Sequence, residues 1–353
     1  MSTDHITDTE ASTDTIAASL VGTDIYKVFG PKPQRALEMA AQGVSRDEIL
    51  QTTGNTVAVR DVSFEVNPGE TFVVMGLSGS GKSTLVRCIA RLVDVTQGHV
   101  YLDGADLTAM NDKELRTVRR QNMSMVFQHF GLFPHRRVID NVAYGLEVQG
   151  VAKATRHEKA LEVLDMVGLG GWGDHYPQQL SGGMQQRVGL GRALAVEPEV
   201  LFFDEPFSAL DPLIRRDMQD ELLRLQAELH RTTMFITHDF DEAIKLGDRI
   251  AIMKDGAFDQ VGTALELLAS PATDYVREFT EDVSRTKVLA AGNVMKPHTD
   301  EVIHATVGAD RTIDEILSTL LAATDEIGVT DTSGSLVGIV DRDAVITLLE
   351  VGS

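Results

Sequence analysis

The sequence predicts an α/β protein whose mostly parallel sheet is covered by helices on both faces. Four short apolar runs each stop at a glycine or a polar residue: TFVVMG (71–76), MSMVFQ (123–128), VLFFDEP (200–206) and TMFITHD (233–239). Helical patterns separate these runs, as expected for buried parallel strands joined by crossover helices. In addition, GLSGSGKST (76–84) links the first run to a helix and fits the pattern of a phosphate-binding loop.

The remaining elements follow in chain order. Residues 57–66 (VAVRDVSFEV) alternate like a half-buried strand, and residues from about 138 to 185 form a helical subdomain. Pro212 opens a helix with one apolar stripe. Near residue 282 the pattern changes to a small α/β unit, 283–353, with a capping box at Thr312 and Glu315, two strands around a turn at 332–334, and a final helix at 342–351.

Composition limits the class of protein. A chain of 353 residues exceeds one typical core, and no run approaches the ~18 apolar residues that a membrane span requires. The formal charge of −21 argues against a nucleic-acid-binding protein. Residues 1–20 are acidic, rich in Thr and Ser and without targeting features, which predicts a disordered tail. The single cysteine, Cys88, lies on a helical pattern and is expected to be a buried apolar residue in a reducing compartment.

The phosphate-binding loop predicts a nucleotide site. Its glycines let backbone N–H groups approach phosphates at a helix N-terminus. Lys82 would reach the β- and γ-phosphates of ATP, Ser83 would ligate Mg²⁺, and Thr84 would lie near the α-phosphate. The predicted ATP-binding residues are Gly76, Ser78, Gly79, Ser80, Gly81, Lys82, Ser83 and Thr84.

Two adjacent carboxylates end the strand at 200–204. Asp204 is placed to hold Mg²⁺, as the acidic residue after such a strand does in other phosphate-loop ATPases. Glu205 is placed to orient and deprotonate the water that attacks the γ-phosphate. The alternative for Glu205 is a carboxylate near the metal without a role as base.

A second glycine-rich turn, LSGGMQQRV (180–188), also opens a helix. A hydroxyl, backbone N–H groups and a positive helix end could cover the open side of a γ-phosphate. If this turn cannot reach the nucleotide of its own chain, it must serve a partner chain in a head-to-tail dimer with two ATP molecules. The residues predicted to act in trans are Ser181, Gly182, Gly183 and Gln185.

With these motifs in this order, residues 24–281 resemble the ATP-binding-cassette (ABC) family, and the second turn is similar to its signature motif. The resemblance implies an ATPase domain at residues 21–282. It also implies that Gln128 senses Mg²⁺, with Ser83 and Asp204 as the other ligands, that Asp211 is the D-loop residue, and that His238 contacts the γ-phosphate. In this family an aromatic ring stacks on adenine, and the candidates here are Phe29 and Tyr26.

Within the family, the chain looks most like the ATPase subunits of glycine betaine/proline betaine importers. A helical insertion at 31–54, FPHRRVIDNVAYGLEVQG and SALDPLIRRDMQDELLRLQ carry this resemblance. It implies a second copy of the chain, two integral-membrane permease subunits, an external substrate-binding protein, no nucleic acid, and a peripheral location on the cytoplasmic face of the membrane. The alternatives are an importer of proline, choline, carnitine or another amino-acid-like solute, an exporter, and an ABC ATPase acting on nucleic acid or ribosomes.

The unit at 283–353 resembles a single CBS repeat, with AGNVMKP, the capped helix and LVGIVDRDAVITLL in order. Nucleotide-binding repeats commonly carry a hydroxyl three places and an Asp six places after the glycine, whereas Asp341 and Ala344 occupy those places here. The resemblance therefore favours a dimerising or ionic-strength-sensing unit over a nucleotide-binding one, and a structural cap remains the alternative.

Overall fold

The computed structural model describes residues 18–128, 131–281, 283–297, 303, 305–322, 326–342 and 345. The predicted tail therefore lies mainly outside the described residues, as do Ala344 and almost all of the predicted final helix. Among the described residues, no helix combines the length and the apolar character needed to cross a membrane.

The predicted α/β fold with a mostly parallel sheet is confirmed. The main sheet has six strands in the order β10–β9–β3–β8–β7–β6, and only β10 runs antiparallel to its neighbour. The strands are β3 (Thr71–Met75), β6 (Met123–Phe127), β7 (Val200–Asp204), β8 (Thr232–Thr237), β9 (Arg249–Lys254) and β10 (Ala257–Gly262).

Alternation along β3 divides the apolar side chains between two cores. Val73 and Met75 belong to one core, which includes the buried stripe of α9 (Pro212–Leu229). Phe72 and Val74 belong to the other, which includes buried residues of α3 (Lys82–Ile89). Because successive side chains of a strand point to opposite faces, a continuous apolar run buries both faces of the sheet. Burial within α3 raises the pKa of the Cys88 thiol to about 11, so Cys88 is a packing residue.

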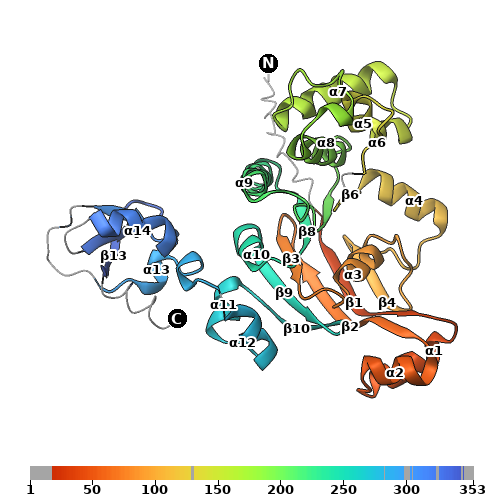
Figure 1. The fold of residues 1–353 in the computed structure, drawn as a ribbon, viewed down its shortest axis with the longest axis horizontal. Coiled ribbons are helices and arrows are strands. Elements are labelled where there is room, and N and C mark those ends of the chain that lie inside the picture. The colour runs from red at the N-terminus through yellow and green to blue at the C-terminus, as the bar shows by residue number, and fades with distance from the viewer. Residues whose placement is uncertain are drawn as a thin grey trace, which may run out of the picture.

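A second, antiparallel sheet was not predicted. It has the order β2–β1–β4–β5, with β1 (Leu20–Phe29), β2 (Thr56–Val66), β4 (Gln97–Leu102) and β5 (Ala105–Asp106). Between β1 and β2 the chain forms α1 (Pro33–Ala41) and α2 (Arg46–Thr53), at the lower right of Figure 1. Both helices bury apolar side chains against the tip of the β1–β2 hairpin.

A helical layer lies beyond the β6 edge of the main sheet (Figure 1). Its helices are α5 (Val138–Val142), α6 (Tyr144–Val148), α7 (Lys153–Met166) and α8 (Gly182–Leu194), and α4 (Asp112–Gln121) precedes β6. Helix α8 begins directly at the second glycine-rich turn. The layer therefore carries that turn at one end of its central helix.

The C-terminal part forms a separate small unit (Figure 1). The last helices before this unit are α10 (Phe240–Leu246), α11 (Ala264–Ala269) and α12 (Asp274–Thr280). The unit itself contains η2 (Arg285–Lys287), α13 (Ala291–Val294), β11 (Thr306–Gly308), α14 (Ile313–Ala322), β12 (Glu326–Thr330) and β13 (Leu336–Asp341). Its own apolar core lies between α14 and the sheet β11–β12–β13. The Lys287 ammonium lies 2.7 Å from the Asp241 carboxylate of α10, which ties this unit to the main body.

Candidate functional site

The loop between β3 and α3 wraps closely around the Lys82 side chain. Lys82 is buried, and its Nζ donates to the backbone oxygens of Gly76 at 2.7 Å and Leu77 at 3.2 Å. Gly81 has φ +111°, and a Cβ at that position would collide with the Ala58 carbonyl oxygen. The hydroxyl of Ser80 is buried and has no hydrogen-bond partner among the described residues.

Asp204 lies at the end of β7, directly against the start of α3. One of its oxygens accepts a 2.7 Å hydrogen bond from the Ser83 hydroxyl, and the other accepts a 3.1 Å bond from the guanidinium of Arg87. Sequence reasoning did not identify Arg87, although the separation of four residues from Ser83 places both on one face of the helix. The predicted neighbourhood of Ser83 and Asp204 is therefore present.

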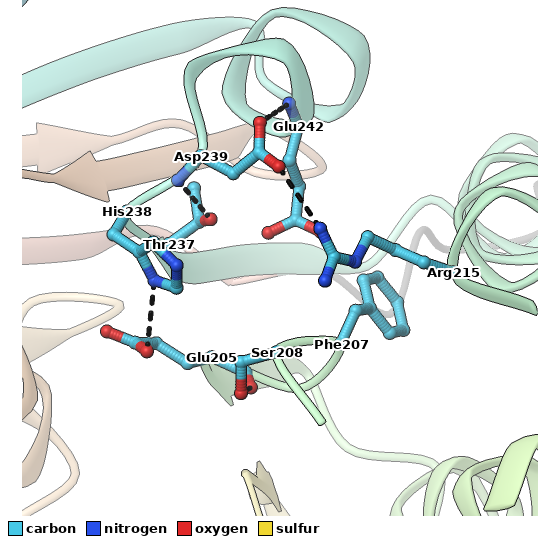
Figure 2. Close-up of a pocket in the computed structure, with 8 residues that line it drawn as sticks. All are labelled: Glu205, Phe207, Ser208, Arg215, Thr237, His238, Asp239 and Glu242. Carbon is cyan, nitrogen blue, oxygen red and sulfur yellow. Dashed lines mark hydrogen bonds and ion pairs between the residues drawn. The ribbon is translucent and has the colours of Figure 1, made fainter. Parts of the chain in front are cut away.

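Glu205 connects the phosphate loop to the end of β8. Its backbone is left-handed, with φ +47°. One of its carboxylate oxygens lies 3.7 Å from Lys82 Nζ. The other contacts Nδ1 of His238 at 3.2 Å, and Figure 2 shows this pair. Burial lowers the pKa of Lys82, and the adjacent Glu205 carboxylate opposes this effect. Lys82 at the start of α3, Glu205 after β7 and His238 after β8 thus meet at one edge of the sheet.

A polar cluster follows His238 at the start of α10 (Figure 2). Asp239 caps this helix by accepting a hydrogen bond from the Glu242 backbone N–H at 3.2 Å. Arg215 of α9 lies 3.4 Å from the Asp239 carboxylate and also donates to the Leu210 backbone oxygen at 3.3 Å. Sequence reasoning missed Arg215, because no pattern indicates that α9 contacts the segment after β8.

The phosphate loop borders an open cleft of about 360 Å³. Phe29, at the end of β1, is 45% exposed and lines this cleft, whereas Tyr26 is buried in the core beneath the insertion. The Lys27 ammonium lies 4.8 Å from the centre of the Phe29 ring. Of the two aromatic candidates, only Phe29 is placed to meet a ligand in the cleft.

None of the described residues of the second glycine-rich turn lines this cleft. Ser181 is the N-cap of α8 and accepts a 3.3 Å hydrogen bond from the Met184 backbone N–H. Gly182 and Gly183 form the first turn of that helix, and the Gln185 side chain donates to the Leu180 backbone oxygen. Asp211 is the N-cap of α9 and accepts from the Ile214 backbone N–H at 3.1 Å.

Gln128 directly follows β6 and is exposed. The parallel pairing of β6 with β7 places Phe127 opposite Asp204 in register. The glutamine therefore lies at the same edge of the sheet as the two carboxylates. Among the described residues, it is not part of the cleft lining.

The geometry defines a phosphate-loop ATPase, and comparison with known proteins shows which kind. Residues 59–208 match the model of the ABC transporter family. The trimethylamine N-oxide transport ATP-binding protein TmoW of Pelagibacter ubique is 49% identical over 91% of this chain and 94% of its own length. The chain belongs to the ABC transporter family of ATP-binding proteins.

Other relatives narrow the subgroup. The glycine betaine transport ATP-binding protein OpuAA of Bacillus subtilis is 56% identical over 77% of this chain and 65% of its own length. The glycine betaine/proline betaine transport system ATP-binding protein ProV of Escherichia coli is 50% identical over 83% of this chain and 73% of its own length. A dimeric, post-hydrolysis structure of the ATP-binding cassette MJ0796 with ADP and Pi has a TM-score of 0.58 and 31% identity, over 69% of this chain and 98% of that protein.

Proposed function

We propose that this chain is the ATP-hydrolysing subunit of an importer for small methylated amines, with glycine betaine and proline betaine as the first candidates. The observation that carries the proposal is the meeting of Lys82, Glu205 and His238 beside the phosphate loop. Relatives at 49–57% identity that serve transport of such solutes support the substrate class.

In the proposed site, the eight residues at 76 and 78–84 hold the phosphates of ATP, and the exposed face of Phe29 stacks on adenine. Lys82 neutralises the terminal phosphates. Glu205 orients and deprotonates the attacking water, and His238 holds the Glu205 carboxylate and contacts the γ-phosphate. Because ATP hydrolysis depends on positioning and electrostatics, preformed contacts among these side chains lower the barrier.

The residues around Ser83 fit a Mg²⁺ ion. The Ser83 hydroxyl and an Asp204 oxygen are hard oxygen ligands of the kind that Mg²⁺ prefers, and they lie 2.7 Å apart. Gln128 lies at the same edge of the sheet. When bound, the ion would neutralise charge on the phosphates. The Arg87 contact would hold the Asp204 carboxylate in place.

The signature residues are proposed to act on the nucleotide of a second copy. Their separation from the cleft of their own chain supports this arrangement, as does the dimeric state of the MJ0796 cassette. We propose further that the dimer docks on permease subunits at the cytoplasmic face of the membrane, and that an external binding protein delivers the solute. Two relatives are described as ATP-binding proteins of transport systems, which supports partners of this kind.

Trimethylamine N-oxide is a second candidate substrate. A match over 91% of the chain, as with TmoW, has to include part of the C-terminal unit, whereas a match over 77%, as with OpuAA, does not have to include it.

We propose that the C-terminal unit is a CBS-like repeat that supports dimerisation or senses ionic strength. The ion pair of Asp341 with Lys296 supports a role other than nucleotide binding.

The test is uptake of labelled glycine betaine and of labelled trimethylamine N-oxide by salt-stressed cells in which this chain is the only such subunit. A Lys82→Ala variant is the matched control. Betaine uptake that depends on Lys82 supports the first candidate, and N-oxide uptake alone supports the second. If neither solute enters in a Lys82-dependent way, the substrate class is wrong.

A further inference from the structure

The helical insertion between β1 and β2 reaches the phosphate loop through one side chain, that of Arg46. Its Nη1 donates to the backbone oxygen of Gly79 at 3.2 Å, in the middle of the loop. Arg46 also lines the same cleft as Phe29 and Lys82. An element outside the sheet therefore places a guanidinium beside the proposed nucleotide.

Arg46 is held there by the packing of the insertion. It is the first residue of α2, whose N-cap Ser45 accepts a 3.3 Å hydrogen bond from the Glu48 backbone N–H. The preceding residue, Val44, accepts a 3.2 Å hydrogen bond from the Arg60 guanidinium of β2. Further along α2, the side chain of Ile49 is fully buried against the hairpin.

The charge balance of the cleft favours an anion beside Arg46. Among the described residues that line it, Arg46 and Lys82 are the cations and Glu205 is the carboxylate. Glu205 already contacts Lys82. The nearest carboxylate to Arg46 is Asp255, at 4.0 Å and 76% exposed, which is too distant for a strong hydrogen bond. A guanidinium has five N–H donors, so most of them remain available to phosphate oxygens.

We propose that Arg46 binds the phosphate tail of the nucleotide in this cleft, so that the insertion contributes directly to ATP affinity. The inference rests on the proposed ATP site. Arginine suits this task because its planar donors match phosphate oxygens and it stays charged. The Gly79 carbonyl fixes one end of the guanidinium and orients its other donors.

The experiment measures the Kd of the purified full-length chain for ATP by displacement of a fluorescent ATP analogue. Arg46→Ala should weaken ATP binding about tenfold, as expected for the loss of a charge-assisted hydrogen bond at a partly exposed site. Arg46→Lys should recover part of the loss. Arg35→Ala is the matched control, because Arg35 is an exposed cation of α1 in the same insertion and does not line the cleft.

Two further readouts separate a phosphate contact from a structural effect. Inorganic tripolyphosphate, used as the competitor, should lose affinity for Arg46→Ala by the same factor as ATP. The ratio between variant and wild-type Kd should also shrink as salt rises, because salt screens a partly exposed ion pair.

Wild-type affinity for ATP in Arg46→Ala would overturn the proposal. Unchanged tripolyphosphate binding beside weakened ATP binding would also overturn it, since the arginine would then contact the base. The proposed ATP site itself is tested separately by Lys82→Ala. If that variant binds ATP like the wild type, the site is wrong whatever Arg46 does.

Discussion

Asn55→Ala should loosen the helical insertion without disturbing the main sheet. Asn55 is fully buried where the two ends of the insertion meet. Its Nδ2 donates to the backbone oxygens of Lys32 at 3.1 Å and Thr53 at 3.2 Å, and its Oδ1 accepts from the Lys32 backbone N–H at 3.3 Å. The substitution removes all three hydrogen bonds.

Each of these bonds contributes about 1 kcal/mol net to the closed state. The backbone groups of Lys32 lie at an exposed position and can bond to water instead, so the total loss should be about 2 kcal/mol. That lowers the free energy of local opening and should speed amide hydrogen exchange at residues 33–53 about 30-fold.

The assay is native-state hydrogen exchange followed by mass spectrometry of peptides. Peptides from β3 and β8 serve as internal references, because the substitution touches neither strand. Gln42→Ala is the control, since it removes an exposed amide side chain from the same insertion. Unchanged exchange at 33–53, or equal acceleration in β3 and β8, would refute the assignment of Asn55 as the closing residue.

Three other predictions concern the site and the polar cluster beside it. Glu205→Gln should keep ATP binding but reduce turnover by about 100-fold or more, because the amide cannot accept the water proton; turnover near the wild-type rate would reject its role as base. Gly81→Ala should abolish ATP binding, because the new Cβ collides with the Ala58 carbonyl oxygen and the backbone is strained as well. Gly79→Ala should weaken ATP binding less, because nothing lies within 4 Å of its Cβ. Equal losses of ATP affinity in the two variants would contradict the role of the collision. Burial raises the pKa of Glu242, and hydrogen bonds from Thr237 and Gln219 oppose this effect. The ionised Glu242 side chain therefore lowers the stability of the fold as pH rises above the ordinary carboxyl pKa of about 4.3. Glu242→Gln should raise the Tm at pH 8 but not at pH 4, and a gain in Tm that does not depend on pH would exclude this cause.

The parts of the site that follow from local patterns could be predicted from the sequence. A strand, a glycine loop and a helix in succession determine the surroundings of Lys82, and an apolar strand ending in two carboxylates positions Asp204 and Glu205. The proximity of Lys82 to these two carboxylates could also be predicted, because parallel strands end at one edge of the sheet.

Contacts that depend on the packing of distant elements could not be predicted. The antiparallel sheet pairs β1 with β4, and no local pattern specifies that partner. Arg46 precedes the phosphate loop by some thirty residues, and only the docking of α2 on the hairpin brings it to Gly79. The contact between Arg215 and Asp239 likewise requires the crossing of α9 and α10.

The closure of the insertion by Asn55 makes the insertion a self-contained block within the hairpin. Phe29 and Thr56 are paired across β1 and β2, with only Gly30 and Asn55 between them and the inserted segment 31–54. If the segment were excised, a Gly-Asn dipeptide would join the strands, and two-residue hairpin loops accept that composition. The two helices can therefore be removed as one block, by deletion of residues 31–54, without shifting the pairing of the strands.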